Sequence, residues 1–240
     1  MRRKTRVHEE DPTTNALLAQ LPATEWSLMV AEAEIVTLRY AEVLFNDGEP
    51  ADIVYFPLTC IVSMMALMQN GQEIEYGSIG REGMVGLQVA LNAQPLRGRA
   101  ICQLEGEAVR FQGEELRRLE NAAAPRLQRL LLRYAQGTIN VLAQSTACNA
   151  LHSVRERTAR WLLMTRDRAG GDTFDLTQEF LSKMLGVRRA GVAESASDLQ
   201  KEGIIDYIRG QIKVLDKERL EAAACECYVH IRDEYARVVD

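Results

Sequence analysis

Residues 176–199 read LTQEFLSKMLGVRRAGVAESASDL, and this stretch decides the fold. Its apolar residues recur at helical spacing on both sides of Gly186, which stands where a sharp turn requires a positive φ. The stretch therefore predicts a helix-turn-helix. Its apolar face consists of Phe180, Leu181, Met184 and Leu185 in the first helix and Val192, Ala196 and Leu199 in the second.

Arg188 and Arg189 stand on the first turn of the second predicted helix. Guanidinium groups match the O6/N7 edge of guanine in the DNA major groove, and they also clamp phosphate. Helix-turn-helix packing also occurs in proteins where it is only a scaffold, and paired arginines are often a solvated surface. The pair favours DNA binding, with a purely structural role as the alternative.

Residues 203–215, GIIDYIRGQIKVL, follow the second helix and contain two β-rich runs joined by a tight Arg-Gly-Gln connection. They predict a hairpin wing. A wing behind a recognition helix places Arg209 and Lys213 where they can meet the phosphate backbone, a contact that gives affinity without sequence information. For each residue alone, an ordinary exposed charge is the alternative.

The chain has 240 residues, of which 47% are hydrophobic and 26% charged, enough for one large or two modest domains. Its net charge of -5 does not by itself indicate a nucleic-acid partner. Residues 152–215, however, carry eleven basic and nine acidic side chains, which is compatible with DNA binding. We expect modest, salt-sensitive non-specific affinity, with specificity set by geometry.

The composition also limits location and chemistry. No apolar run approaches the roughly 20 residues that a membrane span needs. The first residues, MRRKTR, are not followed by the apolar segment of a secretion signal. We therefore expect a cytoplasmic protein with no membrane partner. No Ser/His/Asp, metal-ligand or phosphate-loop pattern indicates an enzyme, so no catalytic residue is assigned.

The cysteines give no zinc-type C-x-x-C spacing, and a cytoplasmic setting favours reduced thiols. Cys225 and Cys227 form a close pair on a short alanine-rich segment that reads as a helix. Helix positions two apart point in different directions, so we expect no metal site and no functional role for this pair. The five cysteines are Cys60, Cys102, Cys148, Cys225 and Cys227.

The N-terminal half has a different residue pattern. Short β-branched and aromatic runs alternate there with turn signals such as Asn46-Asp47-Gly48 and Asn70-Gly71. This pattern predicts a small jelly-roll-like β-roll. Such a roll has an interior or mouth that can hold a ligand. The predicted strands are residues 34–38, 42–45, 53–56, 61–68, 73–79, 100–104 and 108–111.

A long helix is predicted from Pro125 to Leu151. One stripe along it recurs at heptad-like spacing and is a candidate dimer seam. The same stripe could instead pack on the chain's own β-roll, and the sequence leaves these two interpretations open. The helix-turn-helix favours the dimer, because two symmetric modules reading a palindrome gain effective concentration. The stripe contains Leu127, Leu131, Tyr134, Thr138 and Val141.

Ser153-Val154-Arg155-Glu156 has the form of a capping box, which marks the start of a new helix. We therefore place a boundary and a possible hinge at residues 152–153. The predicted division of this α+β chain is a lead-in (1–24), a β-roll (25–124), a long dimerisation helix (125–152), a winged helix-turn-helix (153–220) and a C-terminal helix (221–240).

The order of β-roll, long helix, break and winged helix-turn-helix resembles the Crp/Fnr family of bacterial transcription regulators. The resemblance covers nearly the whole chain and is strongest at residues 176–215. The motifs VYFP at 54–57 and GREGMVG at 80–86 support it. The resemblance implies that the β-roll is an effector domain and that the partner is double-stranded DNA.

The resemblance also implies roles for residues of the helix-turn-helix. Arg189 and Glu194 are expected at base edges. Ala190 stands where the best-known members have a glutamate, so the operator should differ from theirs at one base. The residues expected nearer the DNA backbone are Thr177, Gln178, Arg188 and Gly191.

The effector pocket departs from the cyclic-nucleotide-binding members. Met84 replaces the glutamate that holds the ribose, and Gly98-Arg99 replaces the Arg-Ser pair that grips the phosphate, although arginine here could still neutralise an anion. Because unmatched polar ligand groups cost several kcal/mol on burial, these departures argue against cyclic AMP. The corresponding pocket positions are Gly83, Met84, Arg97, Arg99, Leu142 and Ala143.

Other sensors of this family use an iron-sulfur cluster or haem. No cysteine precedes Cys60, which argues against the cluster. His8, His152 and His230 lie outside the predicted roll, which argues against haem. No cofactor is assigned, and the small-molecule effector is unidentified.

These observations predict a homodimeric, sequence-specific transcription regulator. Its operator should be a palindrome with half-sites about 10 bp apart, centre to centre. RNA polymerase is a further candidate partner. The alternative is a ligand-binding or protein-interaction module whose helix-turn-helix is vestigial.

Overall fold

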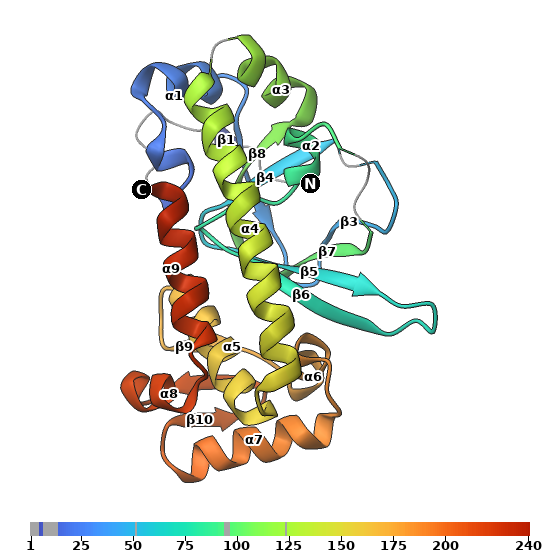
Figure 1. Ribbon diagram of the computed structural model, residues 1–240, viewed down its shortest axis with the longest axis vertical. Helices are drawn as coiled ribbons and strands as arrows, with labels where there is room; N and C mark the ends of the chain where they lie inside the picture. Colours follow the sequence, from blue (N-terminus) through green and yellow to red (C-terminus); the bar gives the residue numbers. More distant parts are fainter. Residues whose placement is uncertain (1–4, 7–13, 51, 94–96, 123) are drawn as a thin grey trace.

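Figure 1 shows the computed structural model, which describes residues 5–6, 14–50, 52–93, 97–122 and 124–240. The β-roll lies beside the upper part of the long helix α4 (Pro125–Leu151), and the helix-turn-helix lies at its lower end. Helix α9 (Cys227–Val239) runs antiparallel to α4 and returns toward the roll. The architecture is α+β, as predicted.

Two antiparallel sheets form the roll, with strand orders β1-β2-β8-β4 and β3-β7-β5-β6. The predicted strands agree with the observed strands β2 to β8 to within two residues. The strands are β1 (Thr5–Arg6), β2 (Glu34–Leu38), β3 (Val43–Phe45), β4 (Ile53–Pro57), β5 (Ile61–Leu67), β6 (Glu73–Ile79), β7 (Arg99–Leu104) and β8 (Gly106–Gln112).

Strands β4 and β8 are buried on both faces, because successive side chains of a strand point to opposite sides of the sheet. Tyr55 and Ala108 enter the core inside the roll, whereas Phe56 and Phe111 enter a second core beneath the helices. The two phenylalanine rings meet edge to face at a centroid distance of 5.7 Å. This double burial explains why β4 reads as a continuous apolar run.

Short helices complete the second core around the roll. Helix α3 was not predicted, because its charged surface hides a single apolar side that includes the fully buried Leu116. The bounds are η2 (Leu18–Gln20), α1 (Ala23–Val30), α2 (Leu87–Ala90) and α3 (Gly113–Ala122).

The predicted dimer seam of α4 is wrong. Four of its residues are at most 5% exposed, and the fifth, Thr138, is half-buried and donates a hydrogen bond from its hydroxyl to the Tyr134 carbonyl oxygen at 2.8 Å. The roll and α9 cover this side of the helix, which is the alternative interpretation of the sequence. The four buried residues are Leu127, Leu131, Tyr134 and Val141.

The opposite side of α4 carries large apolar side chains that nothing covers within the described part of the chain. Leu132 is 57% exposed and Ile139 is 59% exposed. Leu132 and Ile139 are seven residues apart, so they lie on one side of the helix.

The C-terminal part has the predicted winged helix-turn-helix. Ser153 and Glu156 form the predicted capping box at the start of α5. A strand that was not predicted, β9, extends the hairpin into a sheet of order β10-β11-β9. The elements are α5 (Val154–Ala169), β9 (Thr173–Asp175), α6 (Gln178–Leu185), α7 (Arg189–Lys201), β10 (Ile205–Ile208) and β11 (Gln211–Val214).

The predicted single C-terminal helix consists of two, α8 (Lys217–Ala223) and α9, separated by the extended residue Ala224. Helix α9 is bound to α4 along its length. Arg133 donates a hydrogen bond from its Nη2 to the Arg237 carbonyl oxygen at 2.6 Å, and the Asn140 amide donates to Glu234 at 2.7 Å. Within the described ranges, no helix is long and apolar enough to cross a membrane.

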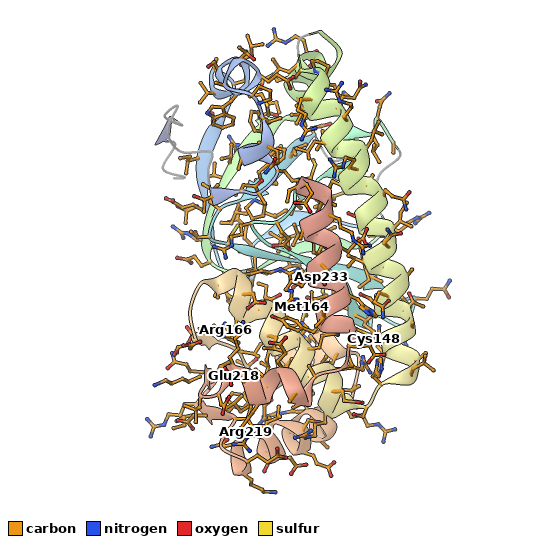
Figure 2. All side chains as sticks on the ribbon, turned by 60° about the vertical axis from the view of Figure 1, so that its left-hand side comes forward. Cys148, Met164, Arg166, Glu218, Arg219 and Asp233 are labelled. Carbon is orange, nitrogen blue, oxygen red and sulfur yellow. The ribbon has the colours of Figure 1, made fainter. Side chains whose placement is uncertain are left out.

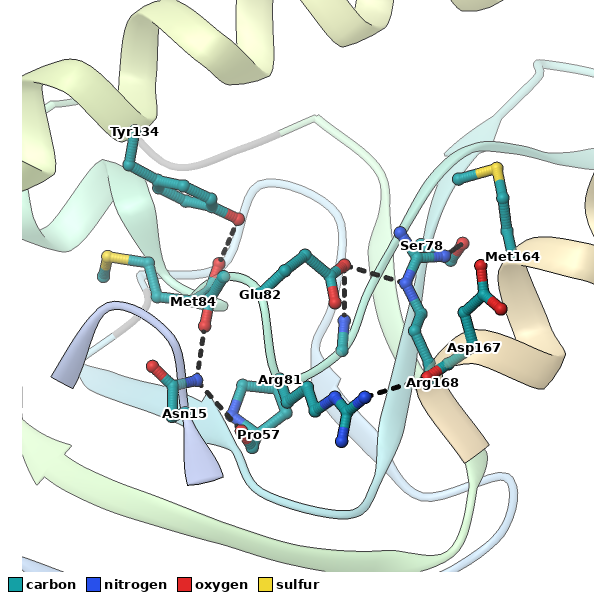
Figure 3. A network of polar contacts seen from close by, with 12 residues as sticks. Asn15, Pro57, Ser78, Arg81, Glu82, Met84, Tyr134, Met164, Asp167 and Arg168 are labelled. Carbon is teal, nitrogen blue, oxygen red and sulfur yellow. Dashed lines mark hydrogen bonds and ion pairs between the residues drawn. The ribbon is translucent and has the colours of Figure 1, made fainter. Parts of the chain in front are cut away.

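A buried polar network joins α5 of the winged helix-turn-helix to the roll (Figure 3). The Arg168 guanidinium of α5 donates to the Glu82 carboxylate at 2.8 Å and to the Ser78 hydroxyl at 2.7 Å. The aliphatic part of Arg168 passes so close to Gly80 that a Cβ there would lie 2.8 Å from it. Nearby, the Trp161 indole donates to Glu75 at 3.1 Å. These contacts fix the position of α5 against β6.

Replacing Arg168 with leucine should destabilise the protein strongly, because the half-buried Glu82 carboxylate would lose the guanidinium that it binds. We expect the free energy of unfolding to fall by about 3 kcal/mol, measured by urea denaturation. The control is Arg166→Leu, which removes a neighbouring arginine paired with the more exposed Asp172 and should cost at most about 1 kcal/mol. Equal losses in both variants would contradict this account of the network.

Candidate nucleic-acid interface

The turn between α6 and α7 has the local geometry that the sequence predicted. Thr177 is the N-cap of α6, and its hydroxyl accepts a hydrogen bond from the Phe180 amide at 3.1 Å. Gly186 ends α6 with φ 63°, the left-handed conformation that favours glycine. A Cβ on Gly186 would also lie 2.3 Å from Ile74 of β6, so the turn approaches the roll closely.

A groove of about 500 Å³ lies between α7 and the wing. It brings together four of the residues predicted to contact DNA: Thr177, Gln178, Arg189 and Arg209. The hairpin turn that carries Arg209 has positive φ at Arg209 and Gly210, 51° and 82°, as tight two-residue turns require. The wing and the start of both helices therefore share one surface.

Other predicted contact residues are placed differently. Arg188 is the N-cap of α7 and lines a separate cleft of about 600 Å³ against the β5–β6 turn. Glu194 and Lys213 are exposed but do not line the groove. Gly191 is half-buried, and a Cβ built on it would approach Val154 of α5. The sequence does not predict this cleft, because the cleft depends on how the roll packs against the helix-turn-helix.

The basic residues of this surface are available to a ligand. Within the ranges that the structure describes, Arg188, Arg189, Arg209 and Lys213 have no carboxylate within ion-pair distance. The wing is held in place independently, because the Tyr207 hydroxyl donates to the Leu176 carbonyl oxygen at 2.9 Å. An unneutralised, exposed set of cations on a fixed frame suits binding to a polyanion.

The pocket positions of the roll are filled by Tyr134 (Figure 3). Its hydroxyl donates to the Met84 carbonyl oxygen at 3.1 Å, and a Cβ on Gly83 would lie 2.4 Å from the hydroxyl oxygen. Met84 is 1% exposed and belongs to the core shared with α4. Burial holds the pKa of Tyr134 well above its usual value, so the hydroxyl stays protonated and remains a donor.

The remaining pocket positions do not join Gly83 and Met84. Arg97 is almost fully exposed and lies 3.9 Å from Asp47, while Arg99 forms an ion pair with Glu73 at 3.0 Å. On α4, Leu142 is half-buried and Ala143 is exposed. The six residues predicted to form the effector pocket are therefore not assembled into one cavity.

The prediction that Cys225 and Cys227 face different directions is wrong. Ala224 is extended and Glu226 is the N-cap of α9, so the two cysteines lie in a bend and not on one helix. Both are buried in one cluster with Cys148, and His152 lies beside them. The Glu226 side chain makes no capping hydrogen bond, so the sequence around it does not show that a helix begins here. The cluster therefore becomes visible only in the folded chain.

Comparison with known proteins agrees with this architecture. Residues 35–122 match the cyclic nucleotide-binding domain family, and residues 156–223 match the Crp-like helix-turn-helix domain family. A CRP-like cAMP-activated global transcriptional regulator of Mycobacterium tuberculosis is 26% identical over 203 residues, covering 82% of this chain and 90% of that protein. The transcriptional activatory protein AadR of Rhodopseudomonas palustris is 24% identical over 200 residues, covering 78% and 80%.

The fold is also similar to solved structures. FixK2 from Bradyrhizobium japonicum aligns with a TM-score of 0.67 at 20% identity, covering 80% of this chain and 98% of that one. A sensor-type β-roll followed by a Crp-like helix-turn-helix defines a transcription regulator with a DNA-binding output domain, and not an enzyme. The chain belongs to the Crp/Fnr family.

Replacing Gly83 with alanine should destabilise the roll, because the new methyl group would collide with the Tyr134 ring. We expect a loss of about 1–3 kcal/mol in the free energy of unfolding, measured by urea denaturation. Most of this loss should disappear in a Tyr134→Ala background.

Gly171→Ala is the matched control, since no atom lies within 4 Å of its Cβ position. It should change stability by less than about 0.5 kcal/mol. If Gly83→Ala cost the same with and without Tyr134, the pocket position would not be closed by that side chain.

Proposed function

We propose that this protein is a homodimeric regulator that reads a palindromic DNA site with the outer face of α7 and holds the flanking phosphates with its wing. The observation that carries the proposal is the groove in which Arg189 and Arg209 lie beside Thr177 and Gln178. Within the described residues these two arginines have no carboxylate partner, and beside hydroxyl and amide groups they offer both charge and hydrogen-bond donors to DNA.

Arg189 and Glu194 would determine sequence preference. An arginine pairs with guanine O6 and N7, and a glutamate accepts a hydrogen bond from cytosine N4. Both side chains are exposed on α7, where they can reach base edges. Arg209 and Lys213 of the wing would contact phosphate, which adds affinity but no sequence information.

A second copy of the chain would bind along the exposed side of α4. This side carries Leu132 and Ile139, followed by the smaller Ala143 and Thr146, at alternating spacings of seven, four and three residues. Such spacing is typical of a seam between two helices. Because α9 and the roll cover the opposite side of α4, this side is accessible to a partner helix.

The roll would respond to a signal other than a cyclic nucleotide. The Mycobacterium tuberculosis relative is cAMP-activated by its name. Here Met84 offers no side-chain acceptor for a ribose, and Tyr134 occupies the space above Gly83. Glu82 lies in the same loop and binds Arg168 of α5, so any movement of this loop would reach the DNA-binding part directly.

The DNA-reading role of α7 can be tested on DNA selected from a random pool. Arg189→Ala should weaken binding by about 1–3 kcal/mol and relax the preference at one position of each half-site. Lys213→Ala should weaken binding to all sequences alike and reduce the salt dependence, log K against log salt, by about 1. Fluorescence anisotropy titrations measure both effects.

The control for DNA binding is Arg118→Ala, which removes the same charge from α3 in the roll and should leave affinity unchanged. If Arg189→Ala had no more effect than Arg118→Ala, the helix-turn-helix would be vestigial. The chain would then be an interaction module.

The dimer can be tested with Ile139→Asp, which places a charge in the proposed seam. We expect a monomer in sedimentation analysis and a large loss of DNA affinity with the fold intact, because burying an unpaired charge is costly. Leu28→Asp, at an exposed apolar position of α1 far from α7, is the control and should leave both the dimer and DNA affinity unchanged. A dimer that survives Ile139→Asp would exclude this seam.

A further inference from the structure

Three cysteines and a histidine converge where the long helix, the hinge and the C-terminal segment meet. Cys148 lies in the last turns of α4 (Figure 2), His152 lies at the break before α5, and Cys225 and Cys227 flank the start of α9. One ligand atom from each residue lies within 4.8 Å of all the others. The three cysteines are buried and the histidine is half-buried.

The spacing matches a single tetrahedral metal ion. Zinc–sulfur bonds of about 2.3 Å and zinc–nitrogen bonds of about 2.0–2.1 Å place neighbouring ligand atoms about 3.5–3.8 Å apart in a tetrahedron. The Sγ atoms of Cys148 and Cys225 are 3.5 Å apart, and the Cys227 Sγ is 3.6 Å from the His152 Nδ1. An iron-sulfur cluster, with several metal ions between its ligands, needs a wider separation.

The surrounding contacts orient these ligands. The His152 Nε2 lies 3.2 Å from the Glu226 carboxylate, so this nitrogen carries the proton and Nδ1 directs its lone pair toward the cysteines. The Gln144 amide donates to the Cys227 sulfur at 3.1 Å. A carboxylate behind a histidine ligand is the usual outer arrangement of zinc sites. Simple packing of apolar thiols would not require either contact.

We propose that Cys148, His152, Cys225 and Cys227 bind one Zn²⁺ ion in a closed, structural site. Three thiolates and one imidazole fill the four positions of a tetrahedron, which leaves no open position for catalysis. Soft sulfur ligands in this geometry select zinc over magnesium, calcium or manganese.

The site would hold together two segments that are far apart in the sequence, residues 148–152 and residues 225–227. It would connect the end of α4 to the start of α9, and it includes the residue at the break between α4 and α5. Bound metal would therefore restrict the angle between the long helix and the DNA-binding part. This consequence rests on the proposed function, whereas metal binding itself does not.

The first experiment measures metal content. The full-length protein, purified in reducing buffer with added Zn²⁺ and then desalted, should retain one zinc ion per chain by elemental analysis. Replacement by Co²⁺ should give strong thiolate-to-cobalt charge-transfer bands and the intense visible bands of tetrahedral cobalt. The variant Cys225→Ser/Cys227→Ser should lose the metal and the bands. Cys102→Ala removes a buried cysteine of the roll and should retain both.

The second experiment tests the outer contact. Glu226→Gln should weaken Zn²⁺ affinity on the order of 10–100-fold in competition with a chromophoric chelator. Glu218→Gln, on the exposed start of α8, removes the same charge and should leave affinity unchanged. A chelator should also lower the melting temperature of the wild type but not that of the Cys225→Ser/Cys227→Ser variant.

Two results would overturn the proposal. One is a zinc content of the reduced wild type no higher than that of the double variant. The other is a Cys148–Cys225 disulfide in protein prepared without reductant, together with no metal in the reduced form, which would make the cluster a redox pair. Normal metal binding with unchanged DNA affinity in the metal-free protein would preserve the site and remove only its role in regulation.

Discussion

The buried ion pair between Arg168 and Glu82 sets the relation between the two halves of this molecule. Arg168 is 8% exposed, and its guanidinium binds both Glu82 and Ser78 of the roll. A charge buried this deeply is tolerated only with its partner in place, so α5 has one favourable position against the roll. The turn before α7 also lies against the roll, because Gly186 packs closely on Ile74 of β6. The position of the helix-turn-helix against the roll therefore depends on this contact.

Helix α4 shows how one helix serves two purposes. Its inner side is part of the core, and there the Tyr134 ring packs directly against Gly83 of the roll. Its outer side remains apolar and exposed. The sequence of this 27-residue helix does not show which apolar side packs on the roll and which is left exposed. A heptad repeat and the spacing of a core-facing side are nearly the same. The missing information was the return of α9, whose Glu234 bonds Asn140 of α4 across 94 residues of sequence.

Local patterns predicted the rest of the fold well. Strand alternation, the Ser153 capping box and the Gly186 turn are short-range features, and the structure has all three. The groove residues Arg189 and Arg209 were also predicted, because a wing must fold back on its recognition helix. The placement of Arg188 against the roll and the meeting of Cys148 with Cys225 depend on long-range packing, which no local pattern contains.

The central claim is that two copies of this chain present two α7 helices to one DNA duplex. Hydroxyl-radical footprinting on a selected high-affinity duplex tests it most directly. The account predicts two protected patches on one face of the DNA, related by two-fold symmetry, with centres about 10 bp or 34–36 Å apart. A single patch, or protection without sequence preference at moderate salt, would contradict it.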